Sequence, residues 1–158
     1  MFILSARKAV VAAILATSMI TPTLPIMAAG SGGSNSSTDT AQPTYQQAKA
    51  AVDAGKYEKA ITSLTALVKA DRQNADAWNL LGYSNRKLKK YDEAAKYYQM
   101  ALKIDPKHRG ALEYQGELFV ETGAFDKAKA NLATLKEICG NCEQYGDLKK
   151  ALAAAGQA

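Results

Sequence analysis

Apolar residues recur at steps of three and four residues along most of the chain, which places them on one face of a helix. The whole pattern then repeats at intervals of 34 residues. Three copies align without a gap, at residues 41–74, 75–108 and 109–142. Each copy is long enough for two short helices, so the pattern predicts three stacked helix pairs that share one core.

Small residues at fixed places in each copy indicate where the two helices of a pair meet. The predicted first helices carry Ala48, Gly82 and Gly116, and the second helices carry Ala60, Ala94 and Ala128. We expect the small residue of each first helix to let the second helix approach closely. Gly55 and Gly123 fall between the helices, where the positive φ that glycine tolerates helps a tight turn.

The middle copy carries the most recognisable set of residues: Trp78, Leu81, Gly82, Tyr91, Ala94, Tyr98, Ala101 and Pro106. With this set the copy closely resembles the tetratricopeptide repeat, a helix–turn–helix unit. Asn85 departs from the family pattern, which usually has tyrosine there. The flanking copies match less well, with Thr44 and Leu112 in place of Trp78. The resemblance implies an all-α fold, an α-solenoid of three such units forming a short right-handed superhelix.

A last amphipathic segment follows the third copy, at residues 143–156. Its apolar residues again recur at helical spacing, as Tyr145, Leu148, Leu152 and Ala155. We expect a capping helix that covers the exposed face of the last repeat. The complete expectation is therefore seven helices and no strands.

The N-terminal part of the chain has a different character. Arg7 and Lys8 precede an apolar run at residues 9–20, and small residues follow it, as in a cleavable bacterial export signal. The run is shorter than the roughly 20 residues that span a bilayer. We expect a signal peptide at residues 1–29, a periplasmic or secreted mature protein, and a disordered Gly- and Ser-rich leader at residues 30–40.

The charge balance gives little support for nucleic acid or an anionic membrane as a partner. The chain has 20 Lys and Arg residues against 15 Asp and Glu residues, a formal charge of +5. Without Arg7 and Lys8 the charge falls to +3, and the remaining charges are scattered. We therefore expect membrane contact only through the transient signal segment.

The sequence offers few residues for catalysis. His108 is the only histidine, and its place between two repeats predicts a solvated surface residue. No nucleophile and base can be grouped around it, and no glycine-rich loop stands between a strand and a helix. We expect no enzyme activity, cofactor, metal or small-molecule substrate.

Cys139 and Cys142 form a C-x-x-C motif that allows several interpretations. Haem attachment is excluded because Glu143 follows in place of histidine, and zinc needs about four ligands. A disulfide staple between the last repeat and the capping helix is preferred, since the export signal points to an oxidising compartment. A redox-active pair is the alternative, although nearby carboxylates disfavour a thiolate and no βαβ pattern is present. Metal binding or pairing between two chains remains as a third option.

The family resemblance implies a protein-binding groove lined by the first helix of each repeat. Carried over position by position, the partner-binding residues would be Tyr45, Lys49, Asn79, Tyr83, Arg86, Lys87, Glu113, Glu117 and Glu121. Cations in the second copy and carboxylates in the third would suit a ligand that is basic at one end and acidic or neutral at the other. A clamp for a C-terminal carboxylate is disfavoured, because Glu113 and Glu117 stand where that clamp has cations. The same residues would also be ordinary solvated positions on a helix surface.

These features together predict a non-enzymatic adaptor or scaffold of the periplasm that binds a protein or peptide segment. One alternative is a thiol–disulfide accessory protein that uses Cys139 and Cys142. Another is a structural element that self-associates, because stacks of repeats can join end to end.

Overall fold

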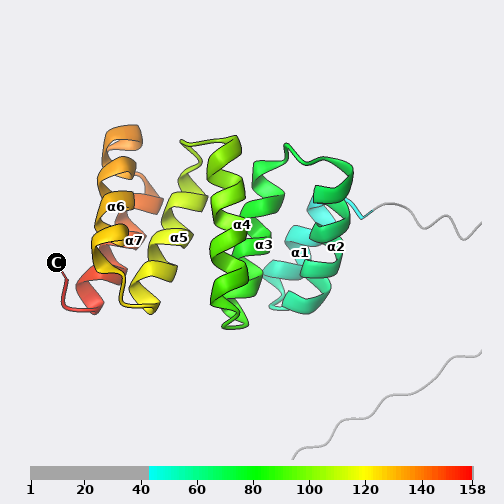
Figure 1. Cartoon of the computed structure of the whole chain (residues 1–158), viewed down its shortest axis with the longest axis horizontal. Coiled ribbons are helices and arrows are strands. Elements are labelled where there is room, and N and C mark those ends of the chain that lie inside the picture. The colour runs from blue at the N-terminus through cyan, green and yellow to red at the C-terminus, as the bar shows by residue number, and fades with distance from the viewer. Residues whose placement is uncertain (1–42, 158) are drawn as a thin grey trace, which may run out of the picture. The chain divides into compact units, whose positions relative to one another are not determined.

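The structure is a computed structural model, and it describes residues 43–157 of the chain. The predicted signal peptide at residues 1–29 and leader at residues 30–40 lie outside this range. Within it the chain forms seven helices and no strand (Figure 1). They are α1 (Tyr45–Asp53), α2 (Tyr57–Ala70), α3 (Ala75–Lys87), α4 (Tyr91–Ile104), α5 (Arg109–Glu121), α6 (Phe125–Cys139) and α7 (Glu143–Ala154).

The helices follow one another as antiparallel pairs, α1 with α2, α3 with α4 and α5 with α6 (Figure 1). Each predicted copy contains one of these pairs, and α7 packs against both helices of the last pair. The predicted all-α solenoid with a closing helix is therefore confirmed. None of the seven helices in the described range is long and apolar enough to cross a membrane.

The core runs between neighbouring pairs and consists mainly of small and aliphatic side chains. The predicted inner stripe of the second pair is confirmed, since Leu81, Ala94, Tyr98 and Ala101 are at most 1% exposed. Leu118 of α5 packs in the same cluster as Ala94 and Tyr98, which joins the second pair to the third. Leu148 and Leu152 bring α7 into the core of the third pair. Neighbouring pairs thus bury a face that one pair alone would leave exposed.

Two helical glycines permit close approaches, but of different partners. A Cβ added at Gly82 would lie 2.5 Å from the ring of Tyr98, so α3 and α4 meet as expected. A Cβ added at Gly116 would lie 2.5 Å from Leu148 of α7. The expectation that Gly116 makes room for the second helix of its own pair is therefore wrong. Its missing side chain admits the capping helix, because Leu148 reaches over α5 at this point.

The turns inside the three helix pairs share one backbone conformation. Gly55 and Gly123 have φ values of 68° and 76°, which confirms the positive φ expected for these turns. The equivalent residue of the second pair is Lys89, with a φ of 60°. The repeat therefore imposes a left-handed residue at this place even where the sequence supplies no glycine.

Candidate functional site

A hollow of about 360 Å³ lies between the first helices of the second and third pairs, beside α7. Its walls consist of Tyr83, Arg86, Lys87, Tyr114, Glu117, Val120, Glu121 and Ala151. We call this hollow the α3–α5 groove. It contains five of the nine residues predicted to bind a partner, and it joins them across two repeats.

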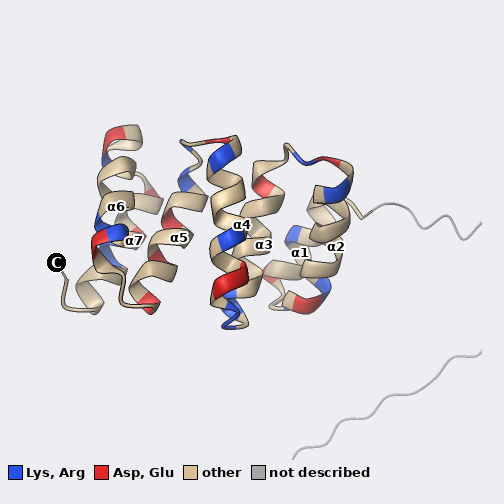
Figure 2. Ribbon diagram, viewed as in Figure 1, with Lys and Arg blue, Asp and Glu red and all other residues tan. Residues whose placement is uncertain are grey.

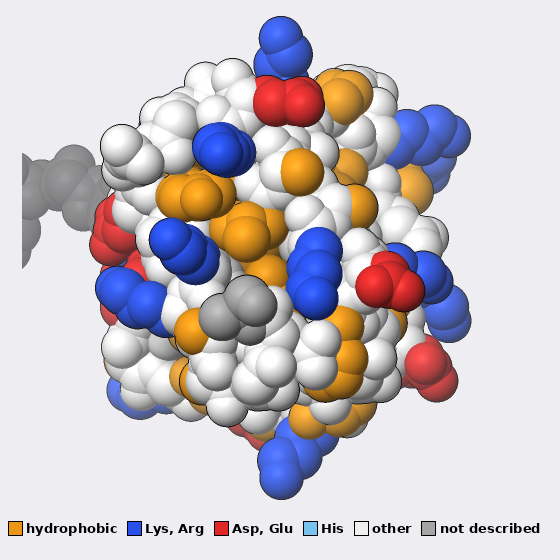
Figure 3. Space-filling model, turned by 90° about the vertical axis from the view of Figure 1, so that its left-hand side faces the viewer, with side chains coloured by type: hydrophobic (Ala, Val, Ile, Leu, Met, Phe, Trp, Pro, Cys, Tyr) orange, Lys and Arg blue, Asp and Glu red, His pale blue; other side chains and the backbone are white. Residues whose placement is uncertain are grey.

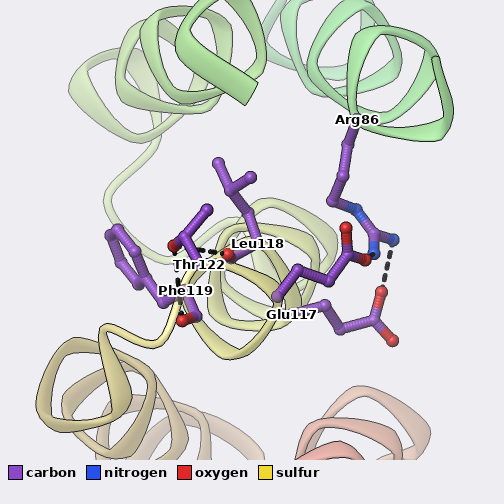
Figure 4. A network of polar contacts seen from close by, with 6 residues as sticks. Arg86, Glu117, Leu118, Phe119 and Thr122 are labelled. Carbon is purple, nitrogen blue, oxygen red and sulfur yellow. Dashed lines mark hydrogen bonds and ion pairs between the residues drawn. The ribbon is translucent and has the colours of Figure 1, made fainter. Parts of the chain in front are cut away.

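Arg86 is the central polar side chain of the α3–α5 groove, and it is only 7% exposed. Its guanidinium donates hydrogen bonds to Glu117 and to Glu121, which lie one turn apart on α5 (Figure 4). The groove charges therefore compensate one another within the chain. The expected division into a basic second copy and an acidic third copy holds in sequence, but these charges pair with each other.

Aromatic rings surround this ion pair. The rings of Tyr83 and Tyr114 are 4.8 Å apart, and the Arg86 guanidinium lies 5.5 Å from the first ring centre and 5.8 Å from the second. The Lys87 ammonium lies 5.8 Å from the centre of the Tyr83 ring and is exposed. Such cation–π contacts hold the tyrosine faces in place at the groove.

Tyr114 was not among the residues predicted from the sequence. It follows Tyr83 by 31 residues, one repeat less one helical turn, and Glu117 follows Arg86 by the same interval. This spacing is the signal that could have identified it, since facing positions on successive first helices differ by that interval here.

Glu113 lies on α5, one turn before Glu117, and is 7% exposed. Burial raises the pKa of Glu113 to about 8, and the negative charges of Glu117, Asp147 and Glu143 add to the rise. Arg86 acts in the opposite direction but does not cancel it. The carboxyl group predicted to meet a partner is therefore enclosed, and it is held largely in its protonated form at neutral pH.

The other predicted partner-binding residues differ in their accessibility. Asn79 is 6% exposed, and its Oδ1 has no hydrogen-bond partner among the described residues. Tyr45 and Lys49 lie on α1 outside the groove walls, and Lys49 pairs with Asp53 at 2.8 Å. The binding role of the nine residues stays a prediction, and Tyr83 and Lys87 are the members best placed to meet a ligand.

His108 differs from the solvated surface residue that the sequence predicted. Its side chain is 12% exposed, and it caps the N-terminus of α5, with Nδ1 accepting a hydrogen bond from the backbone of Ala111 at 3.1 Å. Nε2 then carries the proton and donates to Asp76 of α3 at 3.0 Å. The expectation of a solvated histidine is therefore wrong, because capping and the link between two repeats enclose the ring.

The two cysteines flank the turn between the last two helices. Cys139 ends α6 and Cys142 is the N-cap of α7, and they are joined with Cα atoms 5.6 Å apart, a separation that a disulfide spans. The oxidation state in the cell depends on the compartment, so the staple stays a prediction. Within the described residues no group of three potential ligands is placed to hold a metal ion.

Comparison with known protein families gives two matches over this region. Two family models, each described as a tetratricopeptide repeat, match residues 45–109 and residues 86–156. Together they span every helix of the structure. A search of curated proteins returned no significant match.

Several solved structures share the fold. The type III secretion chaperone SycD of Yersinia enterocolitica, solved with a peptide of the translocator YopD, is 23% identical, with a TM-score of 0.64. That match covers 76% of this chain and 95% of SycD. The second TPR domain of human RPAP3, solved with the HSP70 peptide SGPTIEEVD, is 24% identical, with a TM-score of 0.63. It covers 72% of this chain and 92% of that domain.

Proposed function

The chain belongs to the tetratricopeptide repeat family, and on that premise we propose that it is a non-enzymatic adaptor that binds a peptide or protein segment in the α3–α5 groove. The observation that carries this proposal is the pair of packed tyrosines at the mouth of a preformed hollow. Tyr83 and Tyr114 are both partly exposed, with rings 4.8 Å apart. Rigid aromatic faces of this kind offer a large contact area at a small cost in side-chain entropy.

The charges of the groove restrict the chemistry of the segment. Arg86 is already bonded to two carboxylates, so it does not supply a free cation to a ligand. Lys87 is exposed and offers one, while Glu121 keeps 37% of its side chain exposed and accepts hydrogen bonds. We therefore propose a segment that lays an apolar or aromatic side chain on the tyrosines and makes one polar contact on each side.

The peptides bound in the related structures support a peptide ligand for this chain, but the groove charges favour a ligand with a different sequence from theirs. Two RPAP3 structures, of the first and of the second TPR domain, contain chaperone peptides that end in EEVD. Glu117 and Glu121 border the groove of this chain, and a strongly acidic tail would meet them. A less acidic segment agrees better with the side chains that line the groove.

Site-specific crosslinking in cells tests this proposal. A photoreactive residue placed at Lys87 faces the groove, and one placed at Met100, which is 37% exposed on α4, serves as the control away from it. We expect a defined adduct from position 87 that is absent from position 100. Adducts that form equally from both positions would show that the groove is not the binding site.

We also propose that the mature protein is periplasmic, because residues 1–29 have the features of an export signal. Fractionation of cells expressing a tagged chain tests this, and retention in the cytoplasm would overturn it. The redox alternative is tested by Cys142→Ala. If Cys139 attacks client proteins, this variant accumulates adducts that reductant releases, and the adaptor proposal expects none.

A further inference from the structure

A second hollow, of about 260 Å³, lies between α6 and α7, away from the α3–α5 groove. Its walls are Lys129, Leu132, Lys149, Leu152 and Gln157. We call it the α6–α7 hollow. Figure 3 shows the molecule from the side of these helices, with hydrophobic side chains gathered in the middle and basic side chains around them.

The two helices contribute the same pair of residues to this hollow. On α6 Lys129 precedes Leu132 by one turn, and on α7 Lys149 precedes Leu152 by one turn. Leu132 and Lys149 lie seven residues from the cysteine at the end of their own helix, and Lys129 and Leu152 lie ten residues from it. Because the two helices are antiparallel, each lysine is level with the leucine of the other helix. The hollow therefore has an apolar middle with the two cations at opposite corners.

Both cations are available to an external partner. Lys129 and Lys149 are exposed, and neither forms an ion pair within residues 43–157. Lys129 makes only a long hydrogen bond to the side-chain oxygen of Gln157, at 3.4 Å. No carboxylate stands among the side chains that form the walls.

The apolar floor is recessed, which indicates what shape of partner fits. Leu152 is 2% exposed and Leu132 is half-buried, so neither leucine protrudes. A bilayer surface is bound by apolar side chains that project into it, whereas a recessed floor accepts a projecting side chain from a partner. The exposed large hydrophobic residue of the described range is Met100, which lies on α4. Among the described residues, α6 and α7 therefore carry no exposed large hydrophobic side chain that could project into a bilayer.

We propose that the α6–α7 hollow docks an acidic amphipathic helix of a partner protein. One apolar side chain of that helix lies between Leu132 and Leu152. Carboxylates one turn before and one turn after it pair with Lys129 and Lys149. This interaction is separate from peptide binding in the α3–α5 groove.

A second copy of the chain fits this surface less well. The hollow at the other end of the stack, on α1 and α2, is lined by Gln47, Ala50, Ala51, Ala54, Lys56, Lys59 and Ser63. Stacking the two ends would bring lysines against lysines with no carboxylate in either wall. Like charges brought together disfavour the contact, so the acidic partner is preferred to end-to-end assembly.

The test uses a fluorescent helical peptide of about six turns, because isolated helices shorter than about 12–15 residues are only marginally stable in water. It has one leucine with glutamates one turn to each side, and a matched peptide carries lysines in place of the glutamates. We expect the purified protein to bind the glutamate peptide, with an affinity that falls as salt is added, and not the lysine peptide. Backbone NMR signals of residues 129–132 and 149–152 should shift on binding.

Charge reversal then identifies the site. Lys129→Glu with Lys149→Glu should weaken binding by about tenfold or more, whereas Lys56→Glu with Lys59→Glu, the same change at the other end, should leave it unchanged. Tyr83→Ala, a change in the α3–α5 groove, should also leave the affinity for the glutamate peptide unchanged. The test of the α6–α7 hollow is therefore independent of the groove proposal. Far-UV circular dichroism verifies that each variant is folded.

Three results would overturn the proposal. The first is that the glutamate peptide does not bind. The second is that the two double lysine variants lose the same amount of peptide affinity, which would mean non-specific attraction to a basic surface. The third is an interaction that needs anionic lipid vesicles or a second copy of the chain. Co-sedimentation with phosphatidylserine vesicles tests for lipid binding, and the wild-type protein should stay in the supernatant. Ultracentrifugation at several protein concentrations tests for self-association, and the wild-type protein should remain monomeric.

Discussion

Arg86 on α3 and Glu117 on α5 form an ion pair that joins the second helix pair to the third, with Glu121 as a second acceptor (Figure 4). The exposed fraction rises from 7% at Arg86 to 23% at Glu117 and 37% at Glu121. The cation is thus enclosed while its partners reach solvent. Figure 2 shows that charged residues occur on all the labelled helices. Among the described Lys, Arg, Asp and Glu residues, Arg86 and Glu113 are the two that are buried.

The substitution Arg86→Met should lower the free energy of unfolding by about 1–3 kcal/mol, because it leaves two carboxylates near the buried Glu113 without their cation. Urea unfolding followed by circular dichroism measures this. The neighbouring exposed Lys87 is the matched control, and Lys87→Met should change stability by less than about 0.5 kcal/mol. Equal effects of the two substitutions would contradict the structural role of Arg86.

The substitution Gly82→Ala should destabilise the protein by about 1–3 kcal/mol, since the new Cβ would lie 2.5 Å from the Tyr98 ring. Gly146 on α7 is the control, because a Cβ there meets nothing within 4 Å. Gly146→Ala should stabilise the helix by up to about 1 kcal/mol. Thermal melting of both variants tests the pair, and a stabilising Gly82→Ala would mean that α3 and α4 do not meet as described.

The substitution Lys89→Gly should raise the free energy of unfolding by about 0.5–1 kcal/mol, because Lys89 holds a φ of 60° that glycine adopts without strain. Lys96→Gly, in the middle of α4, should lower it by about 1 kcal/mol. Urea unfolding of the two variants distinguishes the turn from the helix. A loss of stability in both would show that the turn does not need this conformation.

The stability should depend on pH through Glu113. Its pKa is raised to about 8 in the folded protein, so the folded state binds its proton more tightly than the unfolded state does. The resulting stabilisation is complete below the unfolded pKa, near 4.5, and is lost as the pH rises through about 8. Glu117, Asp147, Glu143 and Arg86 are the charged groups that influence it.

The substitution Glu113→Gln should remove most of this dependence, because glutamine stays neutral. Denaturant unfolding of the wild type and the variant at pH 6 and pH 9 measures the difference. Glu93→Gln, an exposed change on α4, should leave the pH profile of the wild type in place. An unaltered profile in Glu113→Gln would place the titrating group elsewhere.

The 34-residue period was enough to predict the helix pairs and their inner stripe, because burial of small and aliphatic residues follows directly from helical spacing. The accessibility of the polar positions was not predictable in this way. Arg86, Glu113 and Asn79 have the sequence character of surface residues, but each is at most 7% exposed in the stacked repeats. How far one helix covers the next depends on side-chain packing between repeats, which a single repeat does not encode.

Gly116 and His108 illustrate the same limit. The repeat pattern predicts that the glycine serves the contact within its own pair, yet Leu148 of α7 occupies the space that it leaves. The pattern predicts a solvated histidine, yet His108 caps α5 and forms a hydrogen bond to Asp76 of the previous repeat. Both contacts cross from one structural unit to the next, where the repeat pattern carries the least information.

The most direct test of the central claim is the affinity of the crosslinked partner segment for groove variants, measured by isothermal titration calorimetry. Tyr83→Ala and Lys87→Glu alter the α3–α5 groove, and Met100→Ala alters an exposed position outside it. We predict that each groove variant binds at least about tenfold more weakly and that Met100→Ala binds as the wild type does. Unchanged affinity in both folded groove variants would contradict the account and move the partner to another surface.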